Sequence, residues 1–220
     1  MRTVIFDLDG TLADTSGDLI AAANRCFRKI GYGELLDPKK DAGIALRGGR
    51  MMLRTGLKRC NRLDEKLVRK LYPELLTFYE QALDHHTFVY PGAMEAVEQM
   101  RQMQIAVGIC TNKPEGLADL LLTRLGVRHE FGSLVGANTL SVSKPHPDPL
   151  FEAVRRVGGD PAQSCLVGDS ITDRDTARAA NMPSILVTFG PDGEDMAELE
   201  PDALLSDYAE LPALANRLLQ

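Results

Sequence analysis

The chain has 220 residues, 44% of them hydrophobic and 25% charged, and a formal net charge of −6. This length suits one domain with an insertion, and the acidic balance argues against nucleic-acid or membrane-surface binding. No apolar stretch approaches the ~20 residues of a membrane span, and the first residues show no signal-peptide pattern, so none is expected. Scattered cysteines without a C-x-x-C pair are typical of the reducing cytoplasm, which is the expected location.

A short buried strand over residues 3–6 is the first predicted element, and a helical block follows it. Helical periodicity interrupted by glycine and proline indicates helices over residues 19–30, 51–60 and 64–83. Another helix is expected to begin at Asp37-Pro38, because proline is favoured in the first helical turn. Residues 15–87 are therefore predicted to be all-helical.

From residue 88 onward, strands alternate with helices. Strands are expected over residues 105–110, 133–136, 165–167 and 184–188, and helices over 93–103, 115–125, 148–157, 172–180 and 207–218. Such alternation is typical of a parallel sheet with helices on both faces. The sequence thus predicts an α/β fold: a doubly wound, Rossmann-like core of residues 1–14 and 88–220, with residues 15–87 inserted as a helical cap domain.

Two aspartates stand where the first strand ends. Asp7 and Asp9 are followed by Gly10, which permits a sharp change of backbone direction. Ligands of open α/β sheets bind at the carboxyl ends of the strands. Two carboxylates at that edge are costly unless a cation or a proton offsets them, so this segment is the first candidate site.

Two later loops carry groups that suit a phosphate. Thr111 and Asn112 stand just before a helix, where they either hold a phosphate oxygen or cap the helix. Lys144 lies in a loop whose three closely spaced prolines are expected to fix an extended form and to aim the ammonium. A lone lysine in a loop is otherwise a solvated surface residue.

Acidic residues recur at the end of the strand over 165–167. Asp169 follows this strand after Gly168, and Asp173 lies four residues later, in the first turn of the next expected helix. Oxygen ligands of this kind suit Mg²⁺. Asp173 has a second interpretation, since a negative charge also stabilises the start of a helix.

These segments resemble the four motifs of the haloacid dehalogenase superfamily, in the order of that family: D-L-D-G-T-L from residue 7, T-N-K from 111, Lys144, and G-D-S-I-T-D from 168. The resemblance covers the whole chain, including an insertion after the first motif. It implies a phosphatase that works through an aspartyl-phosphate and needs Mg²⁺. An acidic residue at position 9 fits phosphate chemistry, because the haloalkanoic-acid dehalogenases of this fold lack it.

The resemblance also implies roles for single residues. Asp7 is the expected nucleophile and Asp9 the expected proton donor and acceptor. Phosphate oxygens are expected to bind Lys144, Thr111, Asn112 and the backbone N–H groups of Leu8 and Asp9. The metal is expected to bind the side chains of Asp7 and Asp169 and the carbonyl oxygen of Asp9, with support from Asp173.

The string D-T-S-G-D-L from residue 14, together with T-N-K, resembles the phosphoglycolate phosphatases within this superfamily. The expected partner is thus a small, carboxylate-bearing phosphate ester, and the chain is expected to be a monomer or a homodimer. Arg47 and Arg50 flank two glycines and are candidates to clamp a substrate carboxylate, with Arg47 preferred. The alternative is a solvated basic face, because several other basic residues lie nearby.

Other functions remain open from the sequence. A pyrophosphatase or nucleotidase would share every core residue. A sugar phosphomutase tends to carry histidine where Asp18 stands. A phosphate-binding or phospho-acceptor protein on the same fold would not need the complete set of core groups.

Overall fold

The computed structural model describes residues 1–191 and 193–219 and divides into two compact units. One unit contains Met1–Ala13 and Val89–Gln220, and the other contains Asp14–Phe88. Two short strands, β2 (Ala13–Asp14) and β3 (Phe88–Val89), pair with each other where the chain passes from one unit to the other. No helix in the described part of the chain is both long and apolar enough to cross a membrane.

The first unit is built on a six-stranded parallel sheet with the order β5-β4-β1-β6-β7-β8. Its strands are β1 (Thr3–Phe6), β4 (Ala106–Cys110), β5 (Leu134–Val135), β6 (Ser164–Gly168), β7 (Ser184–Val187) and β8 (Ala203–Leu205). The central strand β1 is fully buried, as expected for a strand covered on both faces. The edge strand β8 was not expected from the sequence, since its three residues are too few to show periodicity.

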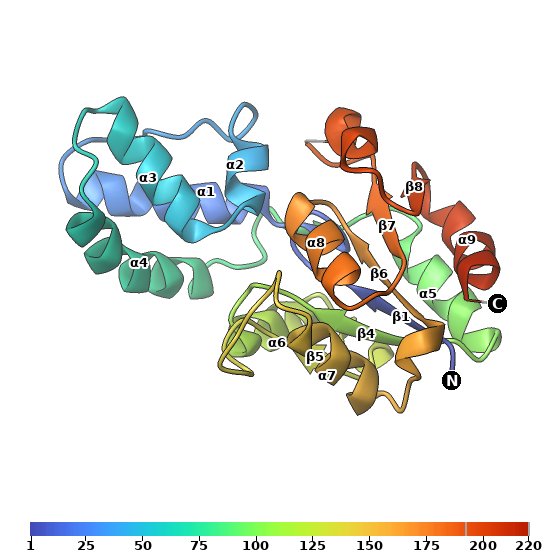
Figure 1. The fold of residues 1–220 in the computed structure, drawn as a ribbon. Helices are drawn as coiled ribbons and strands as arrows, with labels where there is room; N and C mark the ends of the chain where they lie inside the picture. The colour runs from blue at the N-terminus through green and yellow to red at the C-terminus, as the bar shows by residue number, and fades with distance from the viewer. Residues whose placement is uncertain (192, 220) are drawn as a thin grey trace. The chain divides into compact units, whose positions relative to one another are not determined.

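Helices cover both faces of this sheet (Figure 1). They are α5 (Ala93–Gln102), α6 (Glu115–Arg124), α7 (Asp148–Arg156), α8 (Ile171–Ala179) and α9 (Leu211–Leu218). On one face, Leu150, Ala153 and Val154 of α7 join Ile5 of β1 and Leu166 of β6 in a buried apolar cluster. The predicted doubly wound α/β core is confirmed.

The register of the central strands brings their carboxyl ends together. Phe6 of β1 is paired with Ile109 of β4 and with Val167 of β6. The residues that follow these three strands therefore lie side by side at one edge of the sheet. This edge receives the first, second and fourth motifs identified in the sequence.

The second unit is helical and contains α1 (Ser16–Lys29), α2 (Ala42–Leu46), α3 (Gly49–Arg59) and α4 (Glu65–Glu80). The helix expected from Asp37 is absent. Instead, the Asp37 carboxylate accepts hydrogen bonds from the backbone N–H groups of Lys39 and Lys40, which closes a turn, and α2 begins only at Ala42. Aspartate competes in this way with helical hydrogen bonding.

Candidate active site

The loop after β1 places the first two aspartates differently. The backbone N–H of Asp7 still donates to Val167 O at 2.8 Å, so Asp7 is held in the sheet. Beyond it, the carbonyl oxygen of Leu8 accepts hydrogen bonds from Leu12 and Ala13, and the chain turns back. Gly10 permits this turn with a φ of 84°, which a residue with a side chain would resist.

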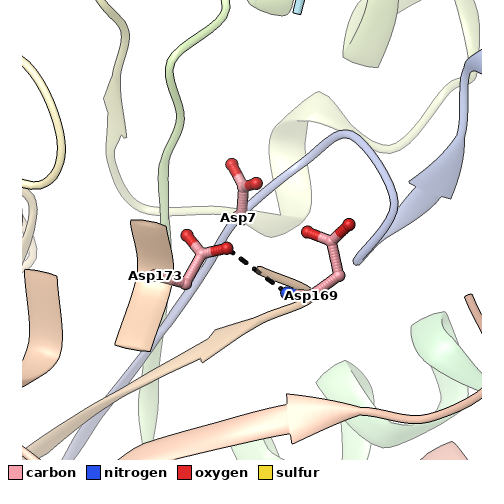
Figure 2. Close-up of side chains that lie close together, drawn as sticks. All are labelled: Asp7, Asp169 and Asp173. Carbon is pink, nitrogen blue, oxygen red and sulfur yellow. Dashed lines mark hydrogen bonds between the residues drawn. The ribbon is translucent and has the colours of Figure 1, made fainter. Parts of the chain in front are cut away.

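Three carboxylates gather at this edge of the sheet. Oxygen atoms of Asp7, Asp169 and Asp173 all lie within 4.8 Å of one another (Figure 2). Such close approach depends on Gly168, because a Cβ atom at that position would lie 2.3 Å from Asp173 Cβ. Asp173 Oδ2 accepts hydrogen bonds from the Asp169 backbone N–H at 3.3 Å and from Ser170 Oγ at 2.5 Å.

Burial and mutual repulsion disfavour the charged forms of two of these groups. Burial, followed by the charges of Asp173 and Asp9, raises the pKa of Asp7 to about 6 even though Lys144 opposes the shift. Burial, followed by the charges of Asp173 and Asp7, raises the pKa of Asp169 well above its ordinary value. The cluster thus holds more negative charge than its own protein surroundings compensate.

Lys144 is the buried cation of this cluster. Its side chain is 2% exposed, and its Nζ atom lies 2.6 Å from Asp173 Oδ1 and 2.9 Å from Asp7 Oδ1. Burial lowers the pKa of this ammonium, but the charges of Asp173 and Asp7 outweigh that effect and raise the pKa above its ordinary value. Lys144 is therefore held in the charged form between two carboxylates.

The loop that carries Lys144 turns, contrary to the extended form expected from its prolines. The peptide bond between Lys144 and Pro145 is cis, and the backbone N–H of His146 donates to Ser143 O at 2.9 Å. Asn112 Nδ2 donates to Lys144 O at 3.0 Å. The side chain of Asn112 thus positions the lysine loop, a contact that the sequence did not reveal.

Thr111 is buried at the end of β4, where its backbone N–H donates to Val135 O at 2.9 Å. Its Oγ1 atom accepts a hydrogen bond from the backbone N–H of Lys113 at 3.2 Å. The Thr111 hydroxyl can therefore still donate its own proton, and a phosphate oxygen at this edge would accept it. The structure thus brings Thr111 and Lys144 to the same sheet edge as Asp7.

Asp9 is not one of the three clustered carboxylates and pairs with Lys113, for which the sequence predicted no role. Lys113 Nζ donates to Asp9 Oδ1 at 2.7 Å and to Asp9 Oδ2 at 3.0 Å. The side chains are 3% and 16% exposed, respectively. The T-N-K string was the available signal for Lys113, but only the fold shows what its side chain contacts.

Arg47 belongs to the helical unit, where it follows α2 and is exposed. Its basic neighbours have structural partners in the same unit: Arg50 lies over the ring of Tyr72, Arg54 pairs with Glu65, and Arg59 pairs with Asp41. The interpretation as a solvated basic face therefore holds only in part. Arg50, Arg54 and Arg59 each have a partner within the helical unit.

Two hydrogen bonds behind the cluster were also missed. Thr11 Oγ1 donates to Asp169 Oδ1 at 3.1 Å, and Tyr208 Oη donates to Thr11 O at 2.6 Å. The position of Thr11 in the first motif was a signal that it belongs to the site. No such signal pointed to Tyr208, because it lies 197 residues from Thr11 in the chain.

We expect Tyr208→Phe to lower the free energy of unfolding by about 1–2 kcal/mol, because a buried carbonyl acceptor loses its donor. Urea titration of the wild-type and variant proteins measures the change. Tyr32→Phe, at a half-buried tyrosine of the helical unit, is the matched control and should change stability by less than about 0.5 kcal/mol. Equal changes in both variants would contradict a specific role for the Tyr208 hydroxyl.

Known proteins resemble this chain over nearly its full length. The family described as "Haloacid dehalogenase-like hydrolase" matches residues 4–187. The phosphoglycolate phosphatase of Agrobacterium fabrum is 36% identical over 217 residues, which is 98% of this chain and 93% of that protein. The phosphoglycolate phosphatase of Mesorhizobium japonicum is 34% identical over 221 residues, with 99% and 96% covered.

A crystal structure from Haemophilus somnus, titled as a predicted phosphoglycolate phosphatase, has the same fold. It superposes with a TM-score of 0.85 at 24% identity and covers 97% of each chain. At that identity the similarity supports the fold alone. The evidence for family membership comes from the two sequence relatives and from the matching family.

Proposed function

The chain belongs to the haloacid dehalogenase-like hydrolases, and from this membership we propose that it is a Mg²⁺-dependent phosphatase of small, carboxylate-bearing phosphate monoesters, with 2-phosphoglycolate as the preferred substrate. One observation carries the proposal. Asp7 directly follows the central strand, with Lys144 Nζ 2.9 Å from its Oδ1 atom and two further carboxylates beside it. A nucleophile, a fixed positive charge and candidate metal ligands thus stand at one edge of the sheet.

The reaction follows from the placement of these groups. A carboxylate oxygen of Asp7 attacks phosphorus, and the bond from phosphorus to the ester oxygen breaks, which leaves an aspartyl-phosphate. Asp9 protonates the departing oxygen and later accepts a proton from the water that hydrolyses the intermediate. Lys144, the Thr111 hydroxyl and the backbone N–H groups of Leu8 and Asn112 bind the phosphoryl oxygens.

The acidic cluster fits a divalent cation, because carboxylate oxygens of Asp7, Asp169 and Asp173 lie within 4.8 Å of one another and burial raises the pKa of Asp7 and of Asp169. Asp7, Asp169 and the backbone carbonyl of Asp9 would hold Mg²⁺, which would supply positive charge to the phosphoryl oxygens. Asp173 already accepts hydrogen bonds from Lys144 and Ser170, so its role is to orient the lysine and to support the metal site.

The helical unit is proposed to act as a cap that closes over the substrate, with Arg47 as a candidate contact for the substrate carboxylate. A cytoplasmic location fits the four free cysteines, three of which are buried. A phosphomutase is disfavoured by the state of Asp18. Its carboxylate is buried and accepts hydrogen bonds from His86 and Thr87, so it is occupied in holding the helical unit together.

A substrate screen tests the proposal. We expect hydrolysis of 2-phosphoglycolate with a kcat/KM at least about 10-fold above those for pyrophosphate, a nucleoside monophosphate, glucose 1-phosphate and p-nitrophenyl phosphate. Chelation of divalent cations should lower every rate, and added Mg²⁺ should restore it. Preference for pyrophosphate or a nucleotide would favour the pyrophosphatase or nucleotidase alternative. A chelator-insensitive rate would contradict the metal site.

A further inference from the structure

The buried ion pair between Lys113 and Asp9 is not explained by the reaction scheme above. The backbone of Lys113 is fixed on two sides, because its N–H donates to Thr111 Oγ1 and its carbonyl oxygen accepts from Ala137 N at 2.9 Å. Its side chain is almost fully buried, and its ammonium contacts both carboxylate oxygens of Asp9. A buried ammonium held by a short loop between β4 and α6 is a fixed charge, unlike a surface lysine.

The site thus contains two buried ammonium groups with different neighbours. Lys144 lies against Asp7, the residue that attacks phosphorus, and so serves the phosphoryl oxygens. Lys113 lies against Asp9, the residue that serves the leaving oxygen. The second ammonium is therefore directed at the part of the substrate that departs.

The Lys113 ammonium lies within reach of a substituent on the leaving group. A proton donor lies about 3 Å from the oxygen that it protonates, and Lys113 Nζ lies 2.7 Å from the nearer Asp9 oxygen. The ammonium is therefore no more than about 6 Å from the leaving oxygen. In 2-phosphoglycolate, the carboxylate carbon is only two bonds from that oxygen, which is short enough for the carboxylate to reach the ammonium when the substrate is turned toward Lys113.

We propose that Lys113 recognises the anionic substituent of the leaving group, with its ammonium shared between Asp9 and the substrate carboxylate. The inference rests on the proposed phosphatase function and deepens it. It places selection for carboxylate-bearing esters in the α/β core, whereas Arg47, the candidate from the sequence, belongs to the helical unit. The competing explanation is that Lys113 only positions Asp9, in which case its loss would impair all esters alike.

The decisive comparison uses two esters of similar size. 2-Phosphoglycolate carries a carboxylate where 2-hydroxyethyl phosphate carries a neutral hydroxymethyl group. In Lys113→Met, we expect the ratio of kcat/KM for the first ester to that for the second to fall about 10- to 100-fold, because a charged contact exists for the first ester alone. Equal losses on both esters would overturn the inference. Arg47→Ala tests the rival contact, and loss of the preference in that variant with retention in Lys113→Met would also overturn the inference.

A second pair of variants keeps the test valid if Lys113→Met does not fold. In Asp9→Asn, the lysine has lost its charged partner, so replacing it should disturb the fold less. The double variant that carries Asp9→Asn and Lys113→Met is compared with the single variant Asp9→Asn. With Mg²⁺ present, calorimetry should show that the double variant binds 2-phosphoglycolate about 10- to 100-fold more weakly. Unchanged affinity would overturn the inference. Failure of the proposed function is seen separately, as a wild-type protein that hydrolyses neither ester.

Discussion

Replacing Asp7 with asparagine is expected to reduce kcat by at least about 10⁴-fold on every phosphate ester, because the amide cannot form the aspartyl-phosphate. Initial rates with Mg²⁺ and 2-phosphoglycolate measure this loss. The fold should persist, since the backbone N–H of Asp7 holds the residue in the sheet through Val167 O. Near-normal turnover by this variant would reject Asp7 as the nucleophile.

The same variant should be more stable than the wild type at neutral pH without metal. Burial raises the pKa of Asp7 from 3.8 to about 6, so the folded chain binds a proton more tightly than the unfolded chain. The stabilisation from this group is complete below pH 3.8 and is lost as the pH rises through about 6. Above that pH, the buried carboxylate costs on the order of 3 kcal/mol, and asparagine avoids most of this cost.

Urea unfolding with a chelator at pH 7.5 and at pH 4 checks this expectation. The advantage of Asp7→Asn should be clear at pH 7.5 and should shrink at pH 4. Added Mg²⁺ should stabilise the wild type more than the variant, because a ligand stabilises the state that binds it. A variant that is less stable than the wild type at pH 7.5 would show that the contact of Asp7 with Lys144 outweighs the cost of burying the carboxylate.

Replacing Lys144 with methionine is expected to have the largest effect on stability. The change leaves the buried carboxylates of Asp7 and Asp173 without their cation, and breaking a buried pair in this way costs about 3–5 kcal/mol. We also expect kcat/KM to fall by about 10²- to 10³-fold, because a fixed charge on the phosphoryl oxygens is lost. Urea unfolding and initial rates measure the two effects.

Two controls distinguish the loss of the Lys144 ion pairs from a general effect of replacing a lysine. Lys58→Met, at an exposed position of α3, should change stability by less than about 0.5 kcal/mol. Asp7→Asn should stabilise Lys144→Met more than it stabilises the wild type, because without Lys144 the Asp7 carboxylate has lost its cation. Equal gains in the two backgrounds would contradict direct coupling between these residues.

The sequence by itself determined the core fold and the chemical groups of the candidate site. Strands over residues 3–6 and 165–167 were visible as apolar runs that end in aspartates, and alternation with helices predicted the parallel sheet. Parallel strands have their carboxyl ends at one edge, and the register of β1, β4 and β6 brings the residues that follow these strands to that edge. These inferences depend on hydrophobic periodicity and on short motifs, both of which can be read from a single sequence.

Only the tertiary structure decided which of these groups contact one another. Lys113 meets Asp9 across 104 residues, Lys144 meets Asp173 across 29, and Tyr208 meets Thr11 across 197. Periodicity reports which face of an element is buried, and it carries no information on the partner that a buried charge will find. At Asp37, hydrogen bonds from the backbone to the carboxylate replace the expected start of a helix. After Lys144, a backbone hydrogen bond from His146 to Ser143 closes a turn that the prolines alone did not predict. The identity of the groups was therefore a property of the sequence, and their pairing was a property of the fold.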